Sequence, residues 1–307
     1  MKHLFIVNPT AGGSDKSEQV RSLIVSAFAQ RPQEEVELYV TKAPLDATAK
    51  IRAEAADGKH LRVYACGGDG TFNECVSGAV GLENVAVCPF PTGTGNDFCR
   101  MFGDEADAFR DLGALIDGSE RPIDVIACNG RYSVNICSVG IDARIGTNVH
   151  KYSSLPLIGG AAAYVVSAVV EMWKGIARQM RISCGAFTAD GPHTLVCVCN
   201  GRFYGGGFNP SLDARLDNGV LDILIAKKVN LLQFAVLIGK YASGHGAELK
   251  KIVTHLRGDS ITIDFDEDNV INLDGEALFA RHVEMRLLPG AVRLLVPRGM
   301  KFFDRED

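Results

Sequence analysis

Residues 62–78 read RVYACGGDGTFNECVSG, in which an apolar run ends in the motif GGDGT at 67–71 and helical spacing follows. Glycine allows the backbone to approach a ligand closely and to adopt positive φ. The N-terminus of the next helix adds unpaired N–H groups and the positive end of a dipole. The stretch therefore predicts a phosphate-binding turn where a strand gives way to a helix. Because the carboxylate of Asp69 would repel phosphate, it is expected to hold a metal, a positively charged group or a donor.

The first 120 residues alternate between strand and helix patterns, which predicts a parallel sheet covered by helices on both faces. Ligands of such sheets bind outside the carboxyl ends of the strands. The strand patterns are at 3–7, 36–41, 62–66 and 85–90, and the helical patterns are at 17–30, 45–56 and 71–79.

After Pro122 short strand patterns dominate, beginning with two runs that flank the hairpin signal Asn129-Gly130. We therefore expect an α/β N-terminal domain followed by a C-terminal antiparallel β-rich sandwich domain. The expected strands are at 124–128, 132–138, 180–183, 195–199, 221–226, 260–265, 270–273, 283–288 and 292–296, with helices at 155–173 and 231–241.

Composition excludes several classes of protein. A hydrophobic content of 47% over 307 residues supports a sizeable core, and a net charge of −5 argues against nucleic-acid binding. A local basic patch for anionic lipid stays open. The nine cysteines are scattered without a CxxC pair, which predicts buried thiols in a reducing cytosol rather than disulfides or a zinc site.

The segment 155–172, LPLIGGAAAYVVSAVVEM, carries no charge before Glu171. Gly, Ala and Ser dilute its hydrophobicity, so we expect a buried helix, with Trp173 in the core, rather than a membrane span.

Two further loops resemble the 67–71 turn in composition. Residues 8–13 (NPTAGG) follow the first strand, and residues 91–98 (PTGTGNDF) follow the fourth. Either is weak evidence alone, because Asn-Pro and Thr-Gly are ordinary turn pairs. Together they predict three ligand-binding loops on one edge of the sheet. The chain has no GxxxxGK[ST] motif and no GxGxxG after its first strand.

These motifs resemble those of the diacylglycerol kinase and sphingosine kinase catalytic-domain family, above all its single-chain bacterial lipid kinases. GGDGT by itself also resembles loops of NAD kinases and phosphofructokinases, whereas GGDGTxNE followed by PTGTGNDF is far more specific. The resemblance runs in order through 8–12, 67–74, 91–98, 135–140 (NICSVG), 200–207, 216–219 and 272–276 (NLDGE).

The resemblance implies an enzyme that uses ATP and Mg²⁺ to phosphorylate a lipid hydroxyl, with diacylglycerol as the first candidate. It implies a nucleotide-binding domain over 1–122, to which 291–307 return, a lipid-substrate domain over 123–290, and a cleft between them. The expected location is the cytoplasm, with peripheral association at a membrane surface, and a homodimer stays open. The alternatives are a soluble kinase similar to NAD kinases and a nucleotide-binding regulatory protein without turnover.

Carried across residue by residue, the resemblance implies a nucleotide site. For Thr41, a strand-end hydroxyl that satisfies the backbone is an equally open reading. The implied nucleotide-contacting residues are Asn8, Pro9, Thr10, Ala11, Gly12, Thr41, Gly67, Gly68, Asp69, Gly70, Thr71, Asn73, Glu74, Thr94, Asn96 and Asp97.

The implied catalytic acids lie in the tripeptide 274–276. Asp274 is expected to be the base and Glu276 a metal or positioning partner, although the two roles are exchangeable, and Asp69 would complete the acidic cluster. In extended geometry Asp274 and Glu276 would share a face. The alternative is an ordinary Asp-Gly turn.

A structural Mg²⁺ site is implied at Arg215, Asn218 and Val220, with the backbone carbonyls of the first and third as ligands. The relatives carry an aspartate where this chain has Asn218. An amide oxygen can bind a hard cation but brings no charge, so this departure puts the metal in doubt.

Overall fold

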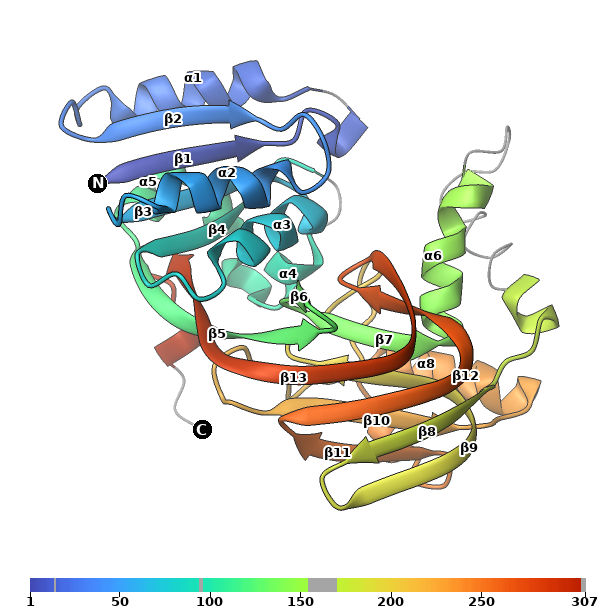
Figure 1. The fold of residues 1–307 in the computed structure, drawn as a ribbon. Coiled ribbons are helices and arrows are strands. Elements are labelled where there is room, and N and C mark those ends of the chain that lie inside the picture. The colour runs from blue at the N-terminus through green and yellow to red at the C-terminus, as the bar shows by residue number, and fades with distance from the viewer. Residues whose placement is uncertain (14, 94–95, 154–169, 305–307) are drawn as a thin grey trace. The chain divides into compact units, whose positions relative to one another are not determined.

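The computed structural model describes residues 1–13, 15–93, 96–153 and 170–304. Its internal contacts divide the chain into two compact units. Unit 1 comprises Met1–Asp124 and Pro289–Asp307, and unit 2 comprises Val125–Leu288 (Figure 1).

Unit 1 contains a parallel sheet of four consecutive strands, β1 (Lys2–Val7), β2 (Glu35–Val40), β3 (Leu61–Gly67) and β4 (Val85–Pro91). Their order is β2-β1-β3-β4, and the last part of β13 (Glu276–Val296) adds a parallel strand beside β4. Val7 is in register with Val40 on one side and Cys66 on the other, so these three strands end at the same edge.

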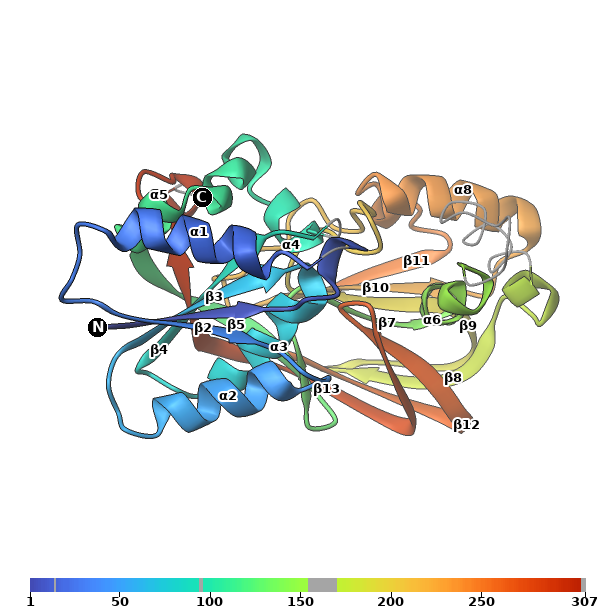
Figure 2. The ribbon, with the colours of Figure 1, turned by 90° about the horizontal axis from the view of Figure 1, so that it is seen from above.

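The sheet of unit 1 is covered on both faces, as the alternating patterns predict. Residues 4–7 of β1 are completely buried, because helices pack on each side. Figure 2 shows α1 (Ser17–Phe28) on one face and α2 (Asp46–Ala55) on the other. The remaining helices are η1 (Ala11–Gly13), α3 (Asp69–Ala79), α4 (Asp97–Arg100), η2 (Gly103–Arg110), α5 (Leu112–Ile116) and η4 (Phe302–Asp304).

Unit 2 is an antiparallel β structure, as expected from its short strand patterns. The strand order is β11-β10-β9-β7-β12-β13, and β8 pairs with both β9 and β12. The strands are β5 (Ser119–Cys128), β6 (Arg131–Ser133), β7 (Ile136–Gly140), β8 (Arg178–Cys184), β9 (Phe187–Cys199), β10 (Leu221–Lys227), β11 (Val253–Gly258) and β12 (Ser260–Leu273).

The predicted hairpin at Asn129-Gly130 is confirmed. β5 and β6 pair up to Cys128 and Arg131, and the two residues between them have φ of 46° and 81°. Positive φ at both central positions is the geometry that an Asn-Gly turn favours.

In the centre of the unit 2 sheet, β7, β10 and the second half of β9 are buried on both faces, which explains why these strands are apolar. In β9, Val196 and Val198 pack into one core cluster, while Leu195, Cys197 and Cys199 pack into another. Side chains of α8 (Leu231–Ala242) complete the second cluster. The bounds of α8 agree with the helix expected at 231–241 to within one residue. All nine cysteines are free and buried, as predicted.

The fold differs from the sequence-based expectation in several elements. The run expected at 132–138 is divided between β6 and β7, and the short helices α4, η2 and α5 were not predicted. α6 (Ile141–Ser153) and β11 were not predicted, because their mixed composition gives no clear period. The pairs of runs expected at 260–265 and 270–273, and at 283–288 and 292–296, form the single strands β12 and β13. Pro289 does not end β13, because it lies after the residues that pair with β12 and before those that pair with β4.

The expectation for Trp173 was wrong, since this side chain is 88% exposed. Most of the helix expected at 155–173 lies outside the described residues. Among the residues that are described, no helix combines the length and the hydrophobicity needed to cross a bilayer.

Candidate active site

Three loops meet at the carboxyl edge of the unit 1 sheet, as the strand order requires. The loop after β1 joins β3 through the Asn8 N–H, which donates to the Cys66 carbonyl over 3.2 Å. The loop after β4 joins β3 through the N–H groups of Thr92 and Gly93, which donate to the Gly67 carbonyl over 3.1 and 3.2 Å. The backbone segments that the sequence singled out are therefore neighbours.

Two glycines of these loops lie where an added side chain would press on its neighbours. A Cβ at Gly67 would lie 2.2 Å from the Thr71 Oγ1, and a Cβ at Gly93 would lie 3.1 Å from the Gly68 nitrogen. At Gly70, by contrast, a Cβ would meet nothing within 4 Å, and the residue is exposed. Close packing thus explains why positions 67 and 93 are glycine, whereas Gly70 faces open space.

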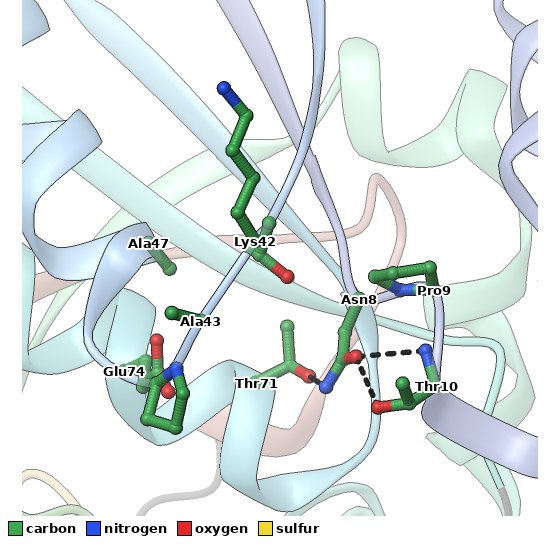
Figure 3. Close-up of a pocket in the computed structure, with 10 residues that line it drawn as sticks. Asn8, Pro9, Thr10, Lys42, Ala43, Ala47, Thr71 and Glu74 are labelled. Carbon is green, nitrogen blue, oxygen red and sulfur yellow. Dashed lines mark hydrogen bonds between the residues drawn. The ribbon is translucent and has the colours of Figure 1, made fainter.

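A pocket of about 260 Å³ opens beside these loops (Figure 3). It draws residues from the loop after β1, the segment after β2, and the helices α2 and α3. The lining residues are Asn8, Pro9, Thr10, Thr41, Lys42, Ala43, Pro44, Ala47, Thr71 and Glu74. Six of them belong to the expected nucleotide set, while 42–44 and Ala47 were not anticipated. Because these four carry no motif, only the fold reveals them.

Asn8 connects two sides of this pocket (Figure 3). Its Nδ2 donates to the Thr71 Oγ1 over 3.2 Å, and its Oδ1 accepts from the backbone N–H and the hydroxyl of Thr10 over 3.0 and 2.8 Å. The amide therefore fixes the 8–10 turn against the start of α3.

Thr41 lines the pocket and also satisfies the backbone, so the two readings of this residue are compatible. Its hydroxyl donates to the Val7 carbonyl over 3.3 Å. Glu74 reaches the pocket from α3, whereas Asn73 on the same helix is buried.

Asp69 occupies the first position of α3, and its carboxylate binds the start of α4. Oδ2 accepts from the Asp97 N–H over 2.8 Å, and Oδ1 accepts from the Phe98 N–H over 3.1 Å. The sequence left three kinds of partner open for Asp69: a metal, a positively charged group or a hydrogen-bond donor. In the structure its partners are hydrogen-bond donors. Phe72 and Phe98 reinforce the junction, with ring centroids 4.4 Å apart.

Asn96 and Asp97 of the 91–98 loop form further local contacts. Asn96 donates from Nδ2 to the Gly93 carbonyl over 3.0 Å, and Asp97 pairs with the Arg100 Nε over 3.0 Å. Asp97 is buried, so its carboxylate is not displayed to solvent. Thr94 lies outside the described residues. Ala11 and Gly12 form η1, where Gly12 has a φ of 71°.

The start of α3 offers backbone donors. The helix begins at Asp69, so the first N–H groups of its opening turn have no acceptor within the helix. These groups carry the positive end of the helix dipole and suit a phosphate.

In unit 2, the tripeptide 274–276 is a turn and not an extended segment. Leu273 pairs with Glu276, and Asp274 and Gly275 between them have φ of 51° and 96°. The expectation that Asp274 and Glu276 share a strand face was therefore wrong. The alternative, an Asp-Gly turn, is what the chain forms.

The carboxylate of Asp274 is enclosed by backbone amides. It accepts from the N–H groups of Val134 over 2.7 Å, of Asn135 over 3.1 Å and of Ile136 over 2.8 Å. Burial raises the pKa of Asp274 to about 6, and the three backbone donors act in the opposite direction because they favour the carboxylate. Sequence reasoning missed these partners, because they lie about 140 residues away.

Glu276 has a more accessible carboxylate. Its side chain is 46% exposed, and Oε2 accepts from the Arg131 Nη2 over 2.7 Å. Arg131 also donates from Nη1 to the Ala277 carbonyl over 3.1 Å, which fixes the guanidinium beside the turn. No sequence motif pointed to Arg131.

The 215–220 loop does not fit the implied Mg²⁺ site. The Asn218 Oδ1 accepts from the Val220 N–H over 3.2 Å, and the Arg215 Nε lies 3.2 Å from an Asp217 oxygen. The Asn218 oxygen is neutral and already accepts within the turn, and the carboxylate of Asp217 is paired with Arg215, so these side chains are a poor donor set for a hard cation. In the described part of the chain, no cluster of three or more His, Cys, Asp or Glu side chains could hold a metal.

Comparison with known families accounts for nearly the whole chain. Residues 2–128 match the diacylglycerol kinase catalytic domain, and residues 135–296 match the YegS C-terminal NAD kinase beta sandwich-like domain.

Relatives of similar length carry names of the same kind. The chain is 31% identical over 286 residues to a probable lipid kinase YegS-like protein of Pseudomonas aeruginosa (strain UCBPP-PA14), with 92% of this chain and 91% of the relative covered. It is 29% identical over 273 residues to a diacylglycerol kinase of Bacillus subtilis (strain 168), with 88% of each covered. A solved structure of a putative diacylglycerol kinase from Bacillus anthracis str. Sterne matches with a TM-score of 0.74 at 25% identity, over 96% of each chain.

Unit 1 carries three loops at one edge of its sheet and matches a kinase catalytic domain, and unit 2 matches the β domain of related proteins. Together with the named relatives, these matches show that the protein is a lipid kinase. The chain belongs to the YegS-like branch of the diacylglycerol kinase catalytic-domain family.

Proposed function

We propose that this lipid kinase transfers the γ-phosphoryl group of ATP to the hydroxyl of diacylglycerol, giving phosphatidic acid. The observation that carries the proposal is the junction of three glycine-containing loops at one sheet edge, held by the side chains of Asn8 and Asp69. Backbone donors at such an edge suit a chain of phosphates.

The nucleotide would use two neighbouring features of unit 1. The pocket beside Asn8, Thr41 and Glu74 offers amide, hydroxyl and carboxylate groups that can hydrogen-bond a ribose or a base. The first N–H groups of α3 and the open space at Gly70 would receive phosphate oxygens. Mg²⁺ would arrive with ATP as its counterion.

In the transfer step, the lipid hydroxyl oxygen forms a bond to the γ-phosphorus while the bond from that phosphorus to the ADP oxygen breaks. The hydroxyl proton needs an acceptor. We assign this role to Glu276, because its carboxylate is exposed and has one side-chain donor, whereas that of Asp274 is occupied by three backbone amides. Asp274 would then be a positioning residue that shapes the 273–276 turn.

The proposed place of action is the cytoplasmic surface of a membrane, where ATP and a lipid with a free hydroxyl are both available. The absence of a membrane-spanning helix among the described residues is compatible with a peripheral enzyme.

An ATP-consumption assay tests the proposal with diacylglycerol in mixed micelles, with NAD, and with neither acceptor. We expect turnover that depends on diacylglycerol and Mg²⁺, with one phosphatidic acid formed for each ADP. Asp69→Ala should lower kcat/KM by about 100-fold or more, because it removes the acceptor that holds the 91–98 loop. Asp57→Ala should leave turnover unchanged, because this carboxylate is exposed and its ion pair with Lys59 lies at the surface. Turnover with NAD alone would replace the proposal with a NAD kinase-like activity, and ATP binding without turnover would indicate a regulatory protein.

A further inference from the structure

α8 of unit 2 is a surface helix that is apolar on both sides. Its inner side chains Phe234, Leu237 and Tyr241 are buried in the core of the unit. Its outer side chains Leu231, Leu232 and Val236 are 63%, 82% and 56% exposed. A surface helix of a globular protein normally has a polar outer face, so this face is suited to a second apolar environment.

The exposed face continues into a groove of about 600 Å³. Leu232 and Val236 form one wall, and the segment 248–252 forms the other, with Leu249 and Ile252 as its apolar members. Figure 2 shows α8 on the outside of unit 2, over β10 and β11. Helix and groove together form a continuous apolar strip, which we call the α8 surface and define as Leu231, Leu232, Val236, Leu249 and Ile252.

Four exposed lysines belong to the segments next to the α8 surface. Lys250 and Lys251 line the groove, and Lys227 and Lys228 lie between the end of β10 and the start of α8. They are brought together by the fold, because the Lys227 N–H donates to the Ile252 carbonyl over 2.9 Å. Within the described ranges, none of these ammonium groups lies in an ion pair with a carboxylate, although the chain as a whole is acidic at −5. The nearby carboxylate of Glu248 is already paired with Lys240 over 2.7 Å.

We propose that the α8 surface docks on a bilayer containing anionic phospholipids, with its apolar side chains inserted among the lipids and the four lysines at the headgroups. Exposed leucines beside lysines are the composition of helices that lie in a membrane interface. Self-association fits less well, because a two-fold interface pairs the same patch with itself, and the carboxylate of Glu248 beside these lysines is already paired with Lys240. This inference extends the proposed function, in which the acceptor lipid lies in a membrane.

Co-sedimentation with vesicles tests the docking directly and does not require turnover. We expect the protein to bind vesicles of equal parts phosphatidylcholine and phosphatidylglycerol, and to bind phosphatidylcholine alone at least about tenfold more weakly. Leu232→Gln with Val236→Gln, and separately Lys250→Glu with Lys251→Glu, should each weaken binding to the mixed vesicles by about tenfold or more. These side chains are exposed, and unchanged thermal melting would verify that the variants fold.

The matched controls change the same types of residue elsewhere. Val25→Gln alters an apolar side chain that is 67% exposed on α1, and Arg21→Glu with Lys301→Glu alters two exposed charges of unit 1. Both should bind the vesicles as the unaltered protein does. Absence of binding by the unaltered protein, or equal loss in controls and α8 variants, would overturn the docking proposal. A dimer that the α8 variants convert to monomer, with vesicle binding intact, would identify the face as a contact between copies and would also overturn it.

A second readout separates docking from catalysis. With a water-soluble short-chain diacylglycerol, the loss of turnover in the α8 variants should be at least about ten times smaller than with diacylglycerol in mixed vesicles. Equal losses on both substrates would contradict docking as the cause. If neither substrate is phosphorylated by the unaltered protein, the proposed function fails, while the sedimentation result still decides whether the α8 surface binds lipid.

Discussion

The carboxylate of Asp69 accepts a hydrogen bond from the backbone N–H of Asp97 over 2.8 Å, although 27 residues separate the two in sequence. Its second oxygen accepts from the next N–H, that of Phe98. One acidic side chain at the start of α3 thereby holds the start of α4 and the loop before it. The contact makes the GGDGT turn and the PTGTGNDF loop one structural piece.

Asp69→Ala should therefore disturb the site by releasing the 91–98 loop. It leaves two backbone donors without their acceptor, and hydrogen bonds to a charged group contribute about 1.5–3 kcal/mol each. We expect kcat/KM for ATP to fall by about 100-fold or more and the melting temperature to fall. Asp69→Asn keeps one acceptor oxygen, so its kcat/KM and its melting temperature should lie between those of Asp69→Ala and of the unaltered protein. Turnover kinetics and thermal melting of both variants check this, and an alanine variant with unaltered kinetics would contradict it.

Two glycines of the same turn give a prediction in which stability and activity separate. A Cβ at Gly70 meets open space, so Gly70→Ala should leave the melting temperature unchanged or slightly higher while raising the KM for ATP by about tenfold, because it occupies the proposed phosphate position. Gly67→Ala should lower stability, since its Cβ would lie 2.2 Å from the Thr71 Oγ1. Thermal melting and ATP titration of the pair check both halves. If Gly70→Ala and the unaltered protein have the same KM for ATP, the proposal that a phosphate binds at Gly70 is contradicted.

The sequence was sufficient to predict β1 to β4 and the helices between them, α1 to α3, because short apolar strands and amphipathic helices have distinct periods. It also located the loops, since glycine clusters are local signals. It did not reveal α4, η2 and α5, which are too short to show a clear helical period. It could not decide which of the three possible kinds of partner Asp69 binds, or identify the partners of Asp274, because both depend on backbone donors that only the tertiary fold brings near.

Other misses had a different physical cause. The 274–276 tripeptide was compatible with an extended strand or a turn, and the positive φ of Asp274 and Gly275 decides for the turn. The four lysines beside the α8 surface come from two segments, and neither segment stands out in the sequence of an acidic chain. Their convergence follows from the pairing of β10 with β11.

Glu276→Gln tests the proposed proton acceptor. The substitution preserves the size of the side chain and can still accept from Arg131, but it removes the basic oxygen. Since a positioned base contributes about 10²–10⁴-fold, kcat should fall within that range while the KM for ATP changes little. Steady-state kinetics check this, and Glu284→Gln on the same strand is a matched control at an exposed acid. If Glu276→Gln retains full kcat, another group accepts the proton.

The raised pKa of Asp274 predicts a dependence of stability on pH. Because the pKa is about 6 in the folded protein and 3.8 in the unfolded reference, the folded state binds the proton more tightly. The contribution of Asp274 to the free energy of unfolding should then be largest below about pH 4 and should decrease as pH rises toward about 6. Asp274→Asn cannot ionise, so its free energy of unfolding relative to the unaltered protein should increase between these pH values, by up to about 3 kcal/mol. Urea unfolding of both proteins at pH 4.5 and pH 7 measures the difference. A difference that stays constant or shrinks over this interval would mean that the amides of 134–136 outweigh burial and that Asp274 remains ionised throughout.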